Sequence, residues 1–258
     1  MKYQQISIIG AGNVAWHLAL ALERAGHTIN EVYSRDINKA EQLAKTLYNS
    51  DPVDDLDFET SASDVFIIAV PDDAIEVVAR QLVVPTNALV AHTSGSQPID
   101  ILMGYDFEPA VFYPLQTFTK GTVLDLQEVP FCIEALNAES LKVVQALAKT
   151  VSRRVEVISS EQRKTLHLAA VFACNFSNHL FHLASNVLEA DELEFDLLHS
   201  LIAETVNKAL EISPARAQTG PAIRGDQRTM KKHLDLLADN PELHNLYHQL
   251  SQSIVANK

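Results

Sequence analysis

The chain has 258 residues, of which 47% are hydrophobic, and a formal net charge of −13. This acidic balance excludes a broad nucleic-acid-binding face, because a phosphate backbone requires a basic surface. The first residues, MKYQQISIIG, lack the apolar core and cleavage site of a signal peptide, and the long apolar stretch 167–188 carries three His and three Asn. These polar residues are costly in lipid, so we expect a cytoplasmic protein with no membrane partner.

Short apolar runs alternate with helical patterns over the first 158 residues. The runs expected to be strands are 5–10, 28–34, 64–70, 88–94, 109–115, 129–135 and 153–159. The helices expected between them are 13–26, 38–49, 72–82 and 138–151. Strands that alternate with helices form a parallel sheet with right-handed crossovers. We therefore expect residues 1–158 to be an α/β domain of the Rossmann class, with a doubly wound and mostly parallel sheet.

No strand pattern follows residue 159, so we expect an all-helical domain of residues 159–258. Residues 159–190 have the pattern of one long helix that is apolar on much of its circumference, and such a helix must be covered on several sides. The later helices are expected at 195–212, 226–239 and 241–257. A small helical domain has little surface with which to cover the long helix, so we expect a homodimer built by the C-terminal helices.

The stretch GAGNVA, residues 10–15, is a G-x-G-x-x-A motif between the first strand and the first helix. Gly10 allows a tight turn, Gly12 removes the side chain that would block a pyrophosphate, and a small Ala15 lets the helix lie close to the strand. The free N–H groups at the start of the helix then face the phosphates. We expect Gly10, Gly12, Asn13 and Val14 to bind a dinucleotide.

The second expected strand ends in Tyr33-Ser34-Arg35-Asp36. An NAD site has Asp or Glu here for the ribose hydroxyls, whereas an arginine binds the 2′-phosphate of NADP through two parallel donors. Ser34 and Arg35 therefore predict NADP as the cofactor. The alternative is that Arg35 is a solvated surface residue, while Asp36 binds the ribose or caps the next helix.

Two further segments follow expected strands, where ligands of doubly wound sheets lie. Val70 and Pro71 are expected to line the path of the cofactor. In the segment HTSGS, residues 92–96, the hydroxyls of Thr93 and Ser94 and the backbone at Gly95 are expected to meet the nicotinamide amide or the substrate. The alternative is a polar loop with helix-capping serines.

These stretches, together with FYPLQTF (Phe112–Phe118), HLAAVFACNF (167–176) and GPAIRGD (220–226), give the chain a family resemblance over essentially its whole length. It resembles the pyrroline-5-carboxylate reductase-like NADP oxidoreductases, and most of all a bacterial family of Rossmann-like proteins with an uncharacterised helical C-terminal domain. The resemblance implies a second domain that dimerises and helps to close the active site. Tyr113 stands where the family often has His.

Hydride transfer requires a proton source, and two residues of the long helix are candidates for the catalytic site. His167 and Asn175 are eight residues apart and therefore lie on roughly the same side of a helix. His167 has a suitable unperturbed pKa for a general acid, and Asn175 has an amide that can orient a carbonyl or imine. The alternatives are a histidine bonded to a backbone carbonyl and an interhelical hydrogen bond from the asparagine.

The segment GPAIRGD places two glycines and a proline inside a helical region. Arg224 is expected to bind a substrate carboxylate, with Asp226 orienting it; the alternative is that Asp226 caps the next helix and forms a structural pair with Arg224. The histidine pairs His179/His182 and His244/His248 have helical spacing, but no third ligand lies nearby in the sequence. We therefore expect no metal site.

The sequence thus predicts an NADP-dependent oxidoreductase that transfers a hydride between NADP(H) and a small oxo or imino acid. The expected substrate is anionic, an expectation that depends on Arg224 and on the family resemblance. The alternative is a sensor or regulatory protein that binds NADP without turnover. A proton donor beside the nicotinamide site would favour the enzyme.

Overall fold

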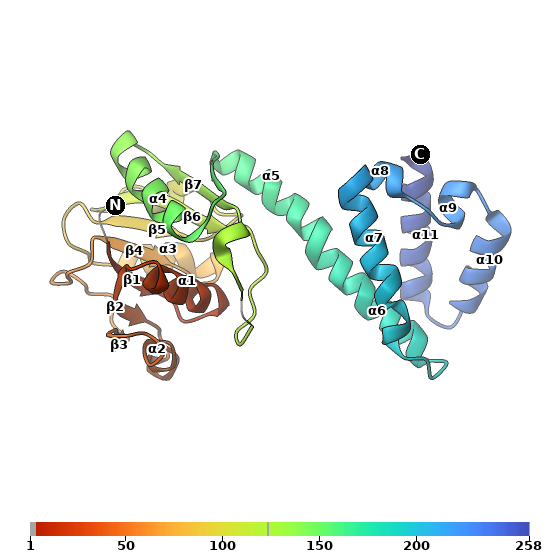
Figure 1. The fold of residues 1–258 in the computed structure, drawn as a ribbon, viewed down its shortest axis with the longest axis horizontal. Helices are drawn as coiled ribbons and strands as arrows, with labels where there is room; N and C mark the ends of the chain where they lie inside the picture. Colours follow the sequence, from red (N-terminus) through yellow and green to blue (C-terminus); the bar gives the residue numbers. More distant parts are fainter. Residues whose placement is uncertain (1–3, 123, 258) are drawn as a thin grey trace. The chain divides into compact units, whose positions relative to one another are not determined.

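The computed structural model describes residues 4–122 and 124–257. They form two compact units, one that ends at Phe176 and one that begins at Ser177 (Figure 1). The first unit carries a mostly parallel sheet with helices and the second is helical, so the expected fold class is confirmed. Among the helices of these residues, none combines the length and the apolar character that a membrane crossing requires.

The first unit is built on an eight-stranded sheet with the order β3-β2-β1-β4-β5-β6-β7-β8. The strands are β1 Gln5–Ile9, β2 Thr28–Tyr33, β3 Asp51–Val53, β4 Val65–Ile68, β5 Leu89–His92, β6 Glu108–Pro114, β7 Phe131–Ala135 and β8 Val155–Val157. Neighbouring strands are parallel, except that β6 and β7 are antiparallel. The strand order runs outward from β1 and β4, which places the switch point of a doubly wound sheet between them.

The register brings the ends of the central strands to one level. Ile9 of β1 pairs with Ile68 of β4, Ile68 pairs with His92 of β5, and His92 pairs with Val111 of β6. Because these strands are parallel, the segments that follow them leave from the same edge of the sheet. Ligands of doubly wound sheets bind at this edge.

Helices cover both faces of the sheet. In this unit they are α1 Asn13–Arg24, α2 Ile37–Ala44, α3 Ile75–Gln81, α4 Ala138–Val151 and α5 Ser160–Ala170. Successive residues of β4 point to opposite faces: Val65 and Ile67 pack in the apolar cluster that includes α1 and α4, whereas Phe66 and Ile68 pack in the cluster that includes α3. Burial on both faces explains why these strands are apolar at nearly every position.

The strand β3 has no counterpart among the expected strands. It is three residues long, Asp-Pro-Val, and lies at the edge of the sheet beside β2. A proline is tolerated in an edge strand because its missing N–H faces away from the sheet. Such a short and partly polar segment carries no strand pattern in the sequence.

The helix expected over 159–190 is present but not regular throughout. Ser159 begins α5 with a capping box, in which its side chain and that of Gln162 each accept a backbone N–H of the other residue. A π-helical segment, Val171–Phe176, follows α5 and precedes α6, Ser177–Glu189. The boundary expected after residue 158 coincides with the last strand, whereas the compact units divide at the end of the π-helical segment.

The second unit contains the C-terminal helices that were expected, with two short additions. After α6 its helices are α7 His199–Ile212, α8 Pro214–Ala217, α9 Pro221–Arg224, α10 Gln227–Leu236 and α11 Pro241–Ala256. The additions, α8 and α9, lie where the sequence suggests only turns. Proline at the start of each is compatible with a helix, because the first N–H groups of a helix have no internal partner.

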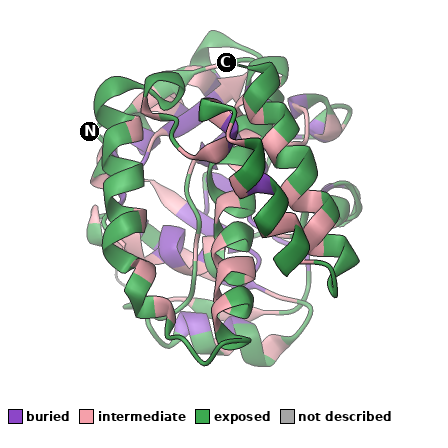
Figure 2. Ribbon diagram, turned by 90° about the vertical axis from the view of Figure 1, so that its right-hand side faces the viewer, coloured by how far each residue is buried: buried purple, intermediate pink, exposed green. Residues whose placement is uncertain are grey.

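Apolar side chains of the second unit are largely uncovered. Among its described hydrophobic residues, Ala222 and Met230 are buried, whereas Leu210 is 81% and Leu236 is 82% exposed. The helices that face the viewer in Figure 2 accordingly show mostly exposed and intermediate residues. Taken by itself, this unit lacks the buried core on which a helical domain depends for its stability.

Candidate functional site

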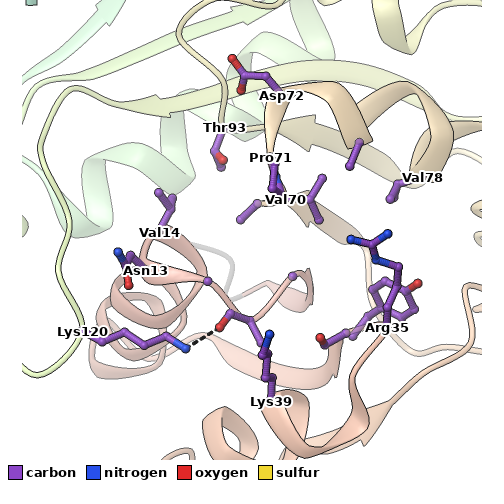
Figure 3. A pocket seen from close by; sticks show the side chains of 17 residues that line it. Asn13, Val14, Arg35, Lys39, Val70, Pro71, Asp72, Val78, Thr93 and Lys120 are labelled. Carbon is purple, nitrogen blue, oxygen red and sulfur yellow. Dashed lines mark hydrogen bonds between the residues drawn. The ribbon is translucent and has the colours of Figure 1, made fainter. Parts of the chain in front are cut away.

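A cavity of about 650 Å³ lies at the carboxyl edge of the sheet, within the first unit (Figure 3). It is lined by the segments that follow β1, β2, β4 and β5, and by one residue from the segment after β6. The lining residues are Gly10, Ala11, Gly12, Asn13, Val14, Tyr33, Ser34, Arg35, Lys39, Ala69, Val70, Pro71, Asp72, Ala74, Val78, Thr93 and Lys120. This volume lies within the range of small-molecule and cofactor sites.

The glycine loop after β1 is shaped for close approach of a ligand. Gly10 has a φ of +127°, and a Cβ there would lie 2.3 Å from the carbonyl oxygen of Ala69, so a side chain at this position is excluded. A Cβ on Gly12 would meet nothing within 4 Å, so the loop leaves open space there. Gly12 precedes α1, and no side chain caps this helix. Open space beside uncapped N–H groups fits the diphosphate of a dinucleotide.

The end of the cavity at β2 and α2 is cationic. Arg35 and Lys39 line it, and Arg35 forms no hydrogen bond or ion pair with another described residue. Asp36 accepts the backbone N–H of Asn38 and thereby caps α2. Capping of this helix was one of the two alternative roles considered for Asp36. No sequence pattern indicated Lys39, which lies in α2 four residues after Arg35.

The cavity continues along the ends of β4 and β5. Val70, Pro71 and Thr93 line it, and so does Asp72, which no sequence pattern indicated. The Thr93 hydroxyl donates to the carbonyl oxygen of Ile68 at 3.3 Å.

Ser94 and Gly95 do not line the cavity. Ser94 is buried, and its hydroxyl accepts the backbone N–H groups of Ser96 at 3.1 Å and Gln97 at 3.0 Å. Ser94 thus stabilises a polar loop, which was the alternative interpretation of residues 92–96. Ser96 in turn donates to Asp72, which ties this loop to the cavity wall.

Gly95 brings two polar side chains together. The Tyr113 hydroxyl and His167 Nδ1 are hydrogen-bonded at 3.3 Å. A Cβ on Gly95 would lie 2.7 Å from His167 Nδ1 and 2.8 Å from the Tyr113 hydroxyl, so only glycine leaves room for this pair. The pair lies against the same loop that lines the cavity through Thr93. The partner of His167 is thus a tyrosine hydroxyl and not the backbone carbonyl of the alternative interpretation.

A buried ion pair anchors the start of α5. Arg163 is fully buried; it donates to the carboxylate of Glu134 on β7 and, at 2.6 Å, to the carbonyl oxygen of Gln97. His167 follows Arg163 by four residues, so both project from one side of α5. The pair therefore fixes the orientation in which α5 presents His167 to Tyr113. Sequence patterns do not reveal it, because its partners lie far apart in the chain.

Burial changes the pKa values of His92 and of Tyr113, the hydrogen-bond partner of His167. Burial, with a smaller effect from Arg163, lowers the pKa of His92 to about 4. Burial also raises the pKa of Tyr113 to about 12, and Cys132 and Asp72 add to that effect. His92 is therefore neutral at pH 7, and Tyr113 keeps its proton and is able to donate a hydrogen bond.

The other expected catalytic residues lie elsewhere in the chain. Asn175 is exposed in the π-helical segment. Arg224, at the end of α9 in the second unit, is exposed and forms no ion pair with any residue in 4–122 or 124–257. Asp226 caps α10 by accepting the backbone N–H (3.0 Å) and the hydroxyl (2.7 Å) of Thr229, and these bonds lower its pKa. The capping role of Asp226 was the alternative interpretation.

The part of the chain that the structure describes contains no cluster of three or more His, Cys, Asp or Glu residues that could hold a metal ion. The rings of His179 and His182 lie 6.3 Å apart on α6.

Comparison with known proteins identifies the family. A model of a Rossmann-like domain matches residues 2–112, and a model of a domain of unknown function, DUF2520, matches residues 129–254. A crystal structure from Bacteroides fragilis, described as a "putative NADP oxidoreductase", is 41% identical, with 98% of each chain covered and a TM-score of 0.89. The chain belongs to this Rossmann–DUF2520 family. A search of curated proteins found no match.

More distant structures share the fold of the Rossmann–DUF2520 chain. A protein from Thermotoga maritima is 23% identical, with a TM-score of 0.72 over 98% of this chain and 97% of its own. A reductive aminase from Aspergillus terreus, in complex with NADPH and ethyl-5-oxohexanoate, is 12% identical, with a TM-score of 0.71 over 98% and 95%. At these identities the likeness concerns the fold alone, and the expected likeness to pyrroline-5-carboxylate reductase stays a prediction.

Proposed function

We propose that this Rossmann–DUF2520 protein is an NADP-dependent oxidoreductase that acts on a small oxo or imino acid. The observation that carries the proposal is the cavity, which runs from a cationic end past a glycine loop with open space at Gly12 to the ends of β4 and β5. This order matches the parts of NADP: a phosphorylated adenosine, a diphosphate and a nicotinamide. The 41% identical relative, which is described as a "putative NADP oxidoreductase", supports it.

Each stretch of the cavity binds one part of the cofactor. Ser34, Arg35 and Lys39 bind the 2′-phosphate, for which a free guanidinium and an ammonium are suitable ligands. The backbone of 10–14 binds the diphosphate at the uncapped start of α1. Val70, Pro71 and Thr93 then border the nicotinamide.

A bound reduced nicotinamide would supply a hydride to the electrophilic carbon of the substrate. In the proposed mechanism His167 supplies the accompanying proton to the substrate oxygen or nitrogen. Tyr113 holds His167 in place through the 3.3 Å hydrogen bond and, with its raised pKa, stays protonated while it does so. Asn175 orients the substrate carbonyl or imine. Arg224 binds its anionic group, and Asp226 fixes the start of α10 beside Arg224.

The second candidate function is a sensor that binds NADP without turnover. The Tyr113–His167 pair favours the enzyme, because a sensor has no need of a proton donor beside the loop that lines the cofactor cavity. Turnover of oxo and imino acids, followed by the absorbance of the reduced nicotinamide, separates the two functions.

Titration of NADPH and NADH into the wild type and an Arg35→Ala variant tests the cofactor assignment. We expect tighter binding of NADPH, and a loss in the variant that is confined to NADPH. Gly12→Val should abolish binding of both nucleotides and leave the fold intact, because the added side chain enters open space within the cavity. Equal affinities of the wild type for both nucleotides would exclude NADP specificity, and binding by Gly12→Val would exclude the diphosphate from this loop.

A further inference from the structure

A strap formed by residues 116–121 follows β6 and crosses the start of α1. Two of its backbone carbonyls are held by side chains of that helix. Asn13 donates from Nδ2 to the carbonyl oxygen of Phe118 at 3.0 Å, and His17 donates from Nε2 to that of Thr119 at 2.9 Å. The strap is therefore fixed against the helix whose first turn borders the cavity.

Lys120 is the strap residue that reaches the cavity. Its ammonium donates to the carbonyl oxygen of Ala11, in the middle of the glycine loop, at 2.7 Å (Figure 3). It also lies 5.1 Å from the centre of the Trp16 ring, which favours a cation over the ring face. No carboxylate in the described ranges forms an ion pair with Lys120. An ammonium has three donors, so the bond to Ala11 does not exhaust its capacity to bind a ligand.

The charged side chains of the cavity wall lie at different places along it. In Figure 3 the cations Lys120, Lys39 and Arg35 are spread from left to right over the lower part of the view, and Asp72 lies at the top. Arg35 and Lys39 belong to the end at β2 and α2, whereas the hydrogen bond to Ala11 places Lys120 at the glycine loop. In a chain with a net charge of −13, a dinucleotide depends on such local cations.

We infer that Lys120 is the cationic ligand of the cofactor diphosphate and that the strap holds it there. The inference rests on the proposed function, because it requires a dinucleotide in this cavity. The uncapped first turn of α1 provides N–H groups on one side of the diphosphate, and Lys120 provides a full positive charge from a segment more than 100 residues away. Lys120 thus contributes to affinity for NADPH and NADH alike, whereas Arg35 contributes to the preference between them.

Two substitutions separate the charge of Lys120 from its packing. Lys120→Met keeps an unbranched stem over Trp16 and removes the ammonium, whereas Lys120→Arg keeps the charge. Lys45→Met serves as the matched control, because Lys45 is exposed and paired with Glu41 and does not line the cavity. The dissociation constants of NADPH, NADH and ADP-ribose are measured by calorimetry for each variant, after thermal unfolding has confirmed that it is folded.

We expect Lys120→Met to weaken all three ligands by the same factor, about tenfold, which corresponds to the loss of one charge-assisted hydrogen bond that is partly screened by solvent. Lys120→Arg should retain most of the affinity, and Lys45→Met all of it. A loss confined to NADPH would assign Lys120 to the 2′-phosphate, and a loss for NADH without one for ADP-ribose would assign it to the nicotinamide end. Either result, or unchanged affinities, would overturn the inference.

The same binding measurements distinguish a failure of the proposed function from a failure of this inference. A wild-type protein that binds none of the three ligands would contradict the dinucleotide site itself. A wild type that binds them, together with a Lys120→Met variant that binds them equally well, would contradict only the role of Lys120.

Discussion

The Tyr113 hydroxyl and His167 Nδ1 form a hydrogen bond of 3.3 Å, and the backbone of Gly95 lies against both side chains. The residues come from three separate segments: the loop after β5, the end of β6 and the last turn of α5. Their meeting at the carboxyl edge of the sheet places a polar pair beside the candidate cofactor cavity. The pair depends on the absence of a side chain at position 95.

Gly95→Ala should therefore disrupt the pair. The added Cβ would come within 3 Å of both polar atoms, so the rings of Tyr113 and His167 must move apart. We expect a loss of about 1–3 kcal/mol in the free energy of unfolding, typical of overpacking, and a marked fall in turnover. Urea unfolding checks the first effect. Gly12→Ala is the control, since a Cβ there meets nothing within 4 Å and should leave stability nearly unchanged. Wild-type stability and turnover in Gly95→Ala would contradict this account.

We expect the free energy of unfolding to fall in acid, because His92 is buried in the folded protein. Burial lowers its pKa to about 4 in the folded state, against 6.5 for the unfolded chain, so the folded protein binds the proton less well. The resulting stability is present above pH 6.5 and is lost as the pH falls towards 4. Between pH 7 and pH 4.5 the expected loss from this residue is about 2 kcal/mol.

His92→Asn isolates this contribution. An asparagine does not titrate, and its side-chain oxygen can accept the backbone N–H of Ser94 that His92 Nδ1 accepts at 3.1 Å. Urea unfolding at pH 7 and pH 4.5 should show a smaller pH effect in the variant than in the wild type. Equal pH effects in the two proteins would mean that other groups, such as the remaining histidines and carboxylates, control acid unfolding.

The fold was predictable where one segment carries the whole signal. Strands such as β4 are buried on both faces, so their apolar runs are visible in the sequence. The edge strand β3 is short and contains a proline, and the short helices α8 and α9 lie among glycines and prolines. In each of these the local pattern resembles a turn, and only the packing of the whole chain decides otherwise.

The candidate site divides in the same way. The glycine loop and Arg35 form a local motif at the start of the first βαβ unit. Lys120 joins the cavity through a contact with a distant segment, since the Lys120–Ala11 hydrogen bond spans 109 positions. Nothing near Lys120 in the sequence indicates that contact. Residues of this kind become visible only when the strand order is known.

Substitutions of Arg224 test whether the substrate carries an anionic group that this residue binds. Its guanidinium is exposed and, within the described chain, forms no ion pair, so it is available to a carboxylate. Arg224→Lys keeps the charge but loses the planar fork, and Arg224→Ala loses both. We expect the Michaelis constant for the substrate to rise in both variants, by roughly 10- to 100-fold in Arg224→Ala, while the affinity for NADPH stays unchanged. Unchanged Michaelis constants would remove Arg224 from the substrate site.

We propose that a second copy of this chain covers the apolar faces of the C-terminal helices. Within the described part of this unit Ala222 and Met230 are buried, and leucines such as Leu210 and Leu236 are exposed. A lone helical unit of this kind would leave its apolar stripes in water, and helices depend on tertiary packing for most of their stability. An interface that compensates for a missing core is expected to bury about 2,000 Å² or more.

Sedimentation equilibrium at micromolar concentration should therefore give twice the 28.5 kDa mass of one chain, and the unfolding temperature should rise with protein concentration. Leu236 lines an apolar groove formed by α6, α10 and α11, so a charge there should weaken association. Leu236→Glu is expected to shift the protein towards a monomer of lower unfolding temperature. Tyr48→Glu is the control, since Tyr48 is 95% exposed on the first unit. A 28.5 kDa species whose unfolding temperature does not depend on concentration would show that the second unit is stable without a partner copy.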